Sequence, residues 1–125
     1  MESTAKQNLE ERLIAFAVQI SKLAEALPNS LTGKYLAGQI IRSGFSPALN
    51  YGEARGAESS ADFIHKMKIA LKELRETFIA LKILRESNFK GQDRPVNNCI
   101  LECNELISIF VKSVQTAETN RKKKL

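Results

Sequence analysis

The chain has 125 residues, of which 43% are apolar and 26% are charged, with three prolines, six glycines and no tryptophan. This length suits one domain with a substantial core, and the composition favours an all-helical protein over a sheet protein or a disordered chain. The formal net charge is +5, but residues 121–125 contribute four of the nineteen basic side chains and no acidic one. The rest of the chain has fifteen basic and fourteen acidic residues, or +1, so the total charge does not indicate a protein-wide nucleic-acid surface.

Neither a membrane segment nor a secretory leader is visible in the sequence. No apolar run reaches the roughly 20 residues needed to cross a bilayer, and the N-terminus lacks the basic start and apolar run of a signal peptide. Two cysteines, Cys99 and Cys103, are too few for a disulfide framework. We therefore expect a cytoplasmic protein.

Apolar residues recur at helical intervals over residues 8–27, which predicts a first helix that ends before Pro28. A second helix should begin within residues 30–32, where a serine and a threonine are both suitable N-caps. Its end should lie within residues 54–57, with Gly56 as the left-handed residue that closes it.

Pro47 lies inside the second helix. There it removes one backbone donor and clashes with the carbonyl of Ser43, at a cost of about 3 kcal/mol. A proline preceded by a serine also resembles the start of a new helix, so both a kink and a break are consistent with the sequence. We favour one kinked helix, because the polar pattern keeps its phase across Pro47.

Ser59 and Asp62 resemble a capping box, with Asp in place of Glu, and predict a third helix that runs to about Ser87. Its expected core face consists of Phe63, Met67, Ala70, Leu71, Leu74, Phe78 and Leu81. After a loop over residues 88–92, Asp93 begins the fourth helix. The apolar residues of this helix alternate by four and three for three heptads: Val96, Ile100, Cys103, Ile107, Phe110, Val114 and Ala117.

Four helices joined by short links predict an all-α protein, an antiparallel up-down-up-down four-helix bundle. Residues 1–120 would form this single domain. Beyond Glu118 the fourth helix is expected to fray, and residues 121–125 would form a basic C-terminal tail.

One polar stripe runs along the second helix at steps of three and four residues: Gln39, Arg42, Ser46, Asn50 and Glu53. Because the helix is otherwise apolar, we expect the stripe to be largely buried against other protein. Arg42 and Glu53 lie about 16 Å apart along the helix, so each needs a partner elsewhere, and Glu76 is the partner we assign to Arg42. We interpret Gln39, Arg42, Ser46, Asn50, Glu53 and Glu76 as a structural polar network that specifies helix register or subunit packing.

Basic residues share the face of the third helix opposite its core residues: Lys68, Lys72, Arg75 and Lys82. They form either a solvated charged face, as many exposed helices do, or a phosphate-binding surface. In the second interpretation the surface is reinforced by the cations of the tail: Arg121, Lys122, Lys123 and Lys124. No base-reading motif accompanies them, so binding to RNA or DNA should be weak, salt-sensitive and tolerant of sequence.

The sequence does not support a catalytic or metal site. His65 is the only histidine and is expected at the surface, without a catalytic partner. With Cys99 and Cys103 it gives three zinc ligands, one fewer than a closed site needs, so a zinc shared between subunits is the remote alternative to buried thiols. The acidic residues Glu73, Glu76 and Glu86 lack the Glu-x-x-His pairs of di-metal bundles. We predict no enzyme activity, no metal or other cofactor and no small-molecule substrate.

A longer pattern extends from the second helix into the third. It reads Gln39-Ile40-x-Arg42-Ser43-x-x-Ser46-x-x-x-Asn50-x-x-Glu53, followed by Arg55, Ser59, Asp62-Phe63, Ile69-Ala70 and Glu76. Over roughly residues 16–89 it resembles the bacterial four-helix-bundle family of 23S rRNA-intervening-sequence proteins. The same fold occurs in the accessory variability proteins of diversity-generating retroelements. The chain departs from the family at residues 50–54, where the family reads Asn-Ile-Ala-Glu-Gly, and at residues 72–73, where it reads Gly-Ser.

The resemblance implies a barrel-shaped homopentamer, and the retroelement relatives bind nucleic acid and reverse transcriptase through a basic surface. Apolar residues outside the core stripes independently favour a second buried surface: Ile14, Val18, Ile69, Ile79 and Ile83. We predict a non-enzymatic, oligomeric binding or scaffold protein that associates with RNA or a nucleoprotein partner. The alternative is a protein–protein interaction module with no nucleic-acid contact.

Overall fold

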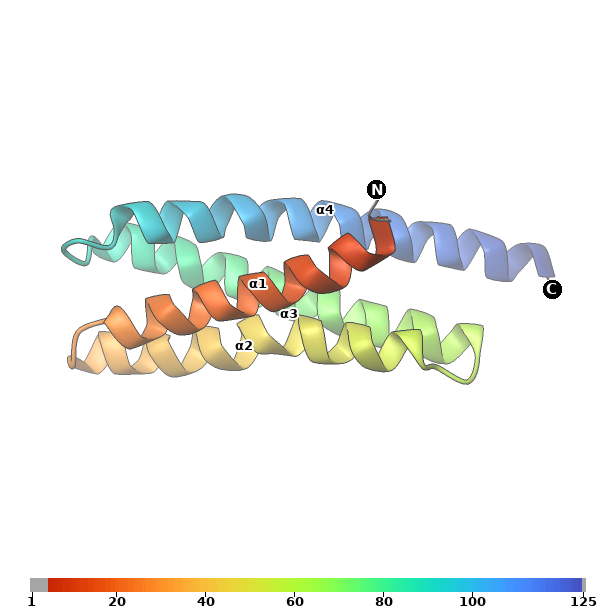
Figure 1. The fold of residues 1–125 in the computed structure, drawn as a ribbon, viewed down its shortest axis with the longest axis horizontal. Coiled ribbons are helices and arrows are strands. Elements are labelled where there is room, and N and C mark those ends of the chain that lie inside the picture. The colour runs from red at the N-terminus through yellow and green to blue at the C-terminus, as the bar shows by residue number, and fades with distance from the viewer. Residues whose placement is uncertain (1–4, 125) are drawn as a thin grey trace.

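Four antiparallel helices make up the part of the chain that the computed structural model describes, residues 5–124, with side chains described from residue 9. They are α1 (Ala5–Ala26), α2 (Leu31–Arg55), α3 (Ser60–Ser87) and α4 (Asp93–Lys124), joined by short loops (Figure 1). Each helix packs on the next, and α4 returns to α1. The backbones of the diagonal pairs lie farther apart within the described residues, although the Tyr51 ring of α2 meets the Phe110 ring of α4 across the core, with ring centres 6.1 Å apart. This arrangement confirms the predicted up-down-up-down bundle.

The helix ends follow local sequence signals at most positions. The Ser30 hydroxyl accepts a hydrogen bond from the Gly33 N–H at 3.0 Å, and the Ser59 hydroxyl accepts one from the Asp62 N–H at 3.0 Å. Both contacts satisfy backbone donors that the first turn of a helix leaves without partners. These two serines therefore fix the starts of α2 and α3.

The end of α2 differs from the prediction. Gly56 has φ −99° and is not left-handed, because its N–H bonds back to the Glu53 carbonyl and the chain leaves through a tight turn. The left-handed helix end occurs instead at Asn88, with φ 59°, which closes α3. Asparagine is among the few residues other than glycine that adopt this conformation readily.

Pro47 does not divide α2, which runs through it as one helix and confirms the choice of a continuous helix over a break. The proline ring is almost completely buried, so apolar contact offsets part of the lost backbone hydrogen bond. Around it lies a core built from all four helices, whose largest fully buried members include Phe16, Ile20, Ile40, Leu74, Leu81, Leu106 and Phe110.

The core face of α3 is rotated slightly from the predicted one. Met67, Ala70, Leu74 and Leu81 are buried as expected, but the predicted Phe63, Leu71 and Phe78 are only half-buried. The positions that complete the buried face are Ile64, Thr77, Ala80 and Leu84. Because α3 contacts both α2 and α4, its buried arc is set by two neighbours rather than by the strongest apolar stripe.

The end of α4 contradicts the predicted fraying beyond Glu118. The helix continues to Lys124 and projects past the turn between α2 and α3 (Figure 1). The four cations of its last turn lie at the negative end of the helix dipole, where positive charge is favourable. Across the described residues, no helix combines the length and apolar character that a bilayer crossing requires.

Candidate macromolecule-binding surfaces

Arg42 lies between two carboxylates of α3. Its guanidinium donates to Glu76 at 2.6 Å, as predicted, and also to Glu73 at 3.1 Å, which was not predicted. The Arg42 side chain is 56% exposed, so the expectation that it is buried is wrong for the single chain. Glu73 is 13% exposed and Glu76 is 37% exposed. Glu73 is thus the less exposed of the two carboxylates, whereas the shorter hydrogen bond is the one to Glu76.

The remaining members of the polar stripe do not form one buried network. Gln39 is half-buried, and the amide nitrogen of Asn50 donates to the hydroxyl and carbonyl oxygens of Ser46 within the same helix. Glu53 is exposed and pairs with Lys66 of α3 at 2.7 Å. The stripe lies along the border between α2 and α3, so its ion pairs join these two helices at the surface and not in the interior.

The buried polar link between α2 and α3 is formed by Ser43 and Thr77. Their hydroxyl oxygens lie 2.9 Å apart, and both side chains are fully buried. The Ser43 hydroxyl also donates to the Gln39 carbonyl, and the Thr77 hydroxyl lies 2.8 Å from the Glu73 carbonyl. Sequence reasoning missed this pair. One signal was available, because Ser43 lies four residues before Pro47 and therefore on the same face of α2 as the proline.

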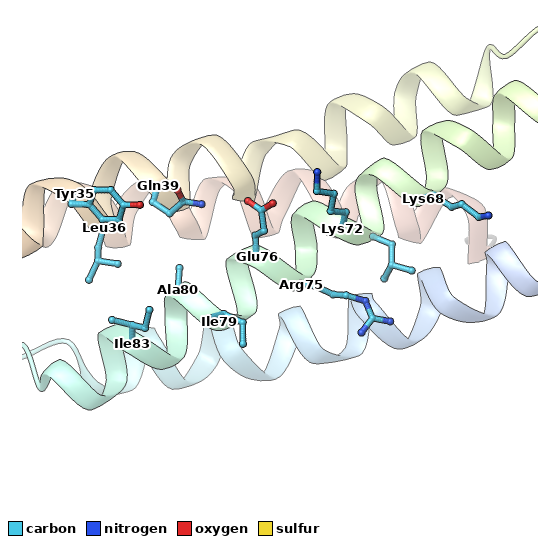
Figure 2. A pocket seen from close by; sticks show the side chains of 11 residues that line it. Tyr35, Leu36, Gln39, Lys68, Lys72, Arg75, Glu76, Ile79, Ala80 and Ile83 are labelled. Carbon is cyan, nitrogen blue, oxygen red and sulfur yellow. The ribbon is translucent and has the colours of Figure 1, made fainter.

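A groove of about 690 Å³ follows the border between α2 and α3 (Figure 2). One end is apolar, with Tyr35 of α2 facing Ile79 and Ile83 of α3, and these three side chains are largely exposed. The other end carries the cations Lys68, Lys72 and Arg75, and Glu76 lies between the two ends (Figure 2). The groove therefore combines an apolar end with a mainly basic end, a combination that suits an amphipathic protein segment.

The four cations of the predicted basic stripe on α3 make different contacts. Lys68 pairs with Glu118 of α4 at 2.8 Å, and this hydrogen bond lowers the pKa of the Glu118 carboxyl. The Lys82 ammonium lies 4.4 Å from the centre of the Phe78 ring. Lys68, Lys72 and Arg75 all line the groove, and Lys82 does not. Three of the four cations thus share one surface, although Lys68 is paired with Glu118 there.

The basic segment of α4 contributes to a second hollow, of about 350 Å³, near the turn between α2 and α3. Arg121 and Lys124 line it, together with Arg55 at the end of α2. Lys122 lies beside Lys68 and Glu118 around a neighbouring pocket. The structure therefore places Arg121, Lys122 and Lys124 beside hollows of the bundle surface, whereas the sequence predicted a separate tail.

The thiols and the histidine do not form a reactive site. Cys99 and Cys103 are buried free thiols, and burial raises their pKa values to about 11 and about 12, with nearby Cys99 and Glu102 adding to the effect at Cys103. The Cys103 thiol donates to the Leu74 carbonyl at 3.3 Å. His65 is exposed, as predicted. Among the described side chains, no group of three or more His, Cys, Asp or Glu could hold a metal ion.

A second ion-pair cluster, which the sequence did not reveal, joins α1 to α4. Arg12 donates to Glu102 at 2.8 Å and to Glu105 at 2.8 Å, and these hydrogen bonds raise the pKa of the guanidinium. The partners are about ninety residues apart, and no local pattern connects them. The cluster stabilises a contact at which α1 and α4 otherwise pack lightly.

These features define an all-helical bundle protein whose conspicuous surfaces are grooves and charged patches. A family model described as 23S rRNA-intervening sequence protein matches residues 6–112, and the chain belongs to that family. A solved structure from Bacteroides thetaiotaomicron, described as a protein with unknown function from the S23 ribosomal protein family, is 31% identical with a TM-score of 0.77. The match covers 85% of this chain and 97% of that one. No curated protein matches the chain.

Proposed function

We propose that this protein is a cytoplasmic, non-enzymatic homo-oligomer that acts as a binding or scaffold protein for RNA or a nucleoprotein partner. A pentamer is the preferred assembly, on the basis of the family resemblance. The observation that carries the proposal is the pair of apolar surfaces that the single chain leaves exposed on α1 and along the α2–α3 groove.

The first surface is the outer face of α1. Ile14 and Val18 lie opposite the core side of this helix and are 51% and 48% exposed. The second surface is the apolar end of the groove, where Ile79 is 55% exposed. Since α1 and α3 are diagonal in the bundle, the two surfaces point in different directions. One copy can therefore present α1 to the groove of the next copy, which is a head-to-tail contact.

Charge supports one alignment of this contact. On α1 the exposed Glu11 precedes Ile14 and Val18, and on α3 the cation Arg75 precedes Ile79 and Ile83, at nearly the same helical spacing. The charges and apolar residues match when the two helices run parallel. Because α1 and α3 run the same way within one bundle, parallel packing makes neighbouring subunits point the same way, as a closed ring requires.

The case for nucleic acid comes from the end of α4. Arg121, Lys122, Lys123 and Lys124 form the last turn of α4, and all four are exposed and therefore accessible to phosphates. In a pentamer, twenty such side chains could act together, so contacts that are individually weak would add through multivalency. The family's description also refers to ribosomal RNA.

Assembly is tested by size-exclusion chromatography coupled to light scattering on the full chain. We expect a mass several times the 14.0 kDa of one chain. The variant Ile79→Asp should lower that mass, because it places a charge in the apolar part of the proposed interface. Leu101→Asp is the matched control, since Leu101 is an exposed apolar residue of α4 outside the groove. A 14.0 kDa monomer at micromolar concentration would refute the oligomer.

The alignment is tested by charge reversal. Arg75→Glu and Glu11→Arg should each weaken assembly, and the double variant should restore it, because the pair then has opposite charges again. Two single variants that leave the mass unchanged, or a double variant that is the weakest of the three, would contradict the parallel alignment.

Nucleic-acid association is tested by filter binding with single- and double-stranded RNA and DNA. The full chain should bind weakly and with little sequence preference, and affinity should fall steeply between roughly 50 and 200 mM salt. A variant ending at Asn120 should bind less tightly. Equal affinities would exclude the C-terminal cations as the contact. No binding by the full chain at low salt would favour the protein-interaction alternative, which the near-neutral charge of the remaining chain also supports.

A further inference from the structure

The hollow at the end of α4 is built from two segments that are distant in the sequence. The first is the α2–α3 junction, with Arg55 at the end of α2, Ala57 in the turn, and Ser59 and Ser60 at the start of α3. The second is the end of α4, which contributes the cations Arg121 and Lys124. Asn120 and three apolar residues complete the described lining, which contains no acidic residue. Its volume is about 350 Å³. Three cations are thus grouped around one concave site.

Arg121 and Lys124 line this hollow because they continue the line of the buried residues of α4. Val114 is the last buried residue of α4, and Ala117, Arg121 and Lys124 follow it at steps of three, four and three. This face of α4 is apolar where it meets the bundle and basic beside the α2–α3 turn. The helix itself ends past that turn (Figure 1). Arg121 and Lys124 are therefore charged residues on the face that α4 otherwise uses to pack on the bundle.

Arg55 is held in position by its own contacts. One terminal nitrogen donates to Glu10 of α1 at 2.8 Å, and the guanidinium carbon lies 5.9 Å from the centre of the Tyr51 ring. Of its three guanidinium nitrogens, this hydrogen bond occupies one, so the others can donate elsewhere. Fixing a guanidinium in advance reduces the entropy lost when it binds an anion.

We propose that this hollow binds a phosphate group, with Arg55, Arg121 and Lys124 as the groups that contact it. Guanidinium groups match the geometry of phosphate oxygens and form two parallel hydrogen bonds, and lysine adds a compact positive charge. The hydroxyl of Ser60 and the amide of Asn120 supply neutral donors at the same site. The phosphate belongs either to a nucleic-acid backbone or to a small phosphate ester, since both present the same charged oxygens.

This inference deepens the proposed function and rests on it for the nucleic-acid source of the phosphate. It differs from a flexible basic tail because it assigns a defined site, includes Arg55 of α2 and excludes Lys123. Arg121 and Lys124 also lie outside residues 6–112, the part of the chain that matches the family model. If the subunits form a ring in which all of them point the same way, the hollows of all subunits would lie on the same rim of the ring.

The site is tested on the full chain with inorganic phosphate, followed by phosphorus NMR at constant ionic strength. The wild type should show saturable binding. Arg55→Gln and Arg121→Gln should each raise the dissociation constant about tenfold, the effect expected when one charge-assisted contact is lost. Lys123→Gln is the matched control, because it removes the same charge next to the hollow but Lys123 does not line it. Its dissociation constant should stay within about twofold of the wild type.

Two outcomes would overturn the site: phosphate binding that does not saturate, or an equal loss of affinity in Lys123→Gln and Arg121→Gln. Fluorescence anisotropy of a labelled oligouridylate with the same variants identifies the source of the phosphate. A parallel loss of RNA affinity supports a backbone phosphate at the site, and unchanged RNA affinity with weakened phosphate binding supports a small phosphate ester. Failure of the proposed function is seen separately, as a monomeric mass or as an absence of RNA binding by the wild type.

Discussion

Replacing Gly44 by alanine should reveal how closely α1 and α2 pack. Gly44 is buried, and an added Cβ would lie 2.9 Å from Cγ2 and 3.1 Å from Cγ1 of Ile20. Ile20 is β-branched and fully buried, so its side chain cannot rotate away easily. Overpacking of this kind costs about 1–3 kcal/mol, whereas the better helix propensity of alanine returns about 1 kcal/mol. The net change should be a loss of up to about 2 kcal/mol in the free energy of unfolding.

The matched controls are Gly38→Ala and Gly52→Ala in the same helix, where an added Cβ meets nothing within 4 Å. Both gain the helix propensity of alanine without a clash, so each should stabilise the protein by about 0.5–1 kcal/mol. The difference between Gly44→Ala and either control isolates the packing cost, about 1–3 kcal/mol. Urea unfolding at one fixed protein concentration measures all three, since assembly would make stability depend on concentration. Equal stabilisation by the three substitutions would refute the close contact with Ile20.

Two further predictions concern the buried polar groups. Thr77→Val keeps the shape of the side chain but removes its hydrogen bond to Ser43, so it should lower the free energy of unfolding by about 1 kcal/mol. A double-mutant cycle with Ser43→Ala should show coupling, and strictly additive losses would mean that the two hydroxyls do not interact in solution. The thiols have raised pKa values in the folded state, so the stability they support is complete below about pH 9 and is lost as pH rises toward about 11 and 12. Urea unfolding at pH 7 and pH 10 should show this fall in the wild type and a smaller one in Cys103→Val, and identical pH dependences would contradict it.

The helices and most of their limits could be predicted from the sequence because the signals are local. Ser30 and Ser59 cap α2 and α3 through their own side chains, and Asp93 begins α4 as expected. The exposure of His65, Ile14, Ile79 and Ile83 also followed from helical phase, whereas Ile69, likewise expected outside the core stripe, is half-buried. These features depend on neighbours within a few residues of each other.

The tertiary structure decided which polar groups are buried and which surfaces are formed. The stripe that contains Arg42 and Glu53 was expected to be buried, but α3 covers only one flank of it. The charged groups of Arg42 and Glu53 therefore stay in solvent. The buried polar contact between α2 and α3 is made by Ser43 instead. The hollow forms beside the end of α4 because this helix continues to Lys124 and extends past the α2–α3 turn (Figure 1). The hollow unites Arg55 with Arg121, sixty-six residues later, and periodicity within one helix carries no information about such a meeting. Helical phase fixes the direction of a side chain relative to its own axis, whereas the packing of neighbouring helices determines what it meets.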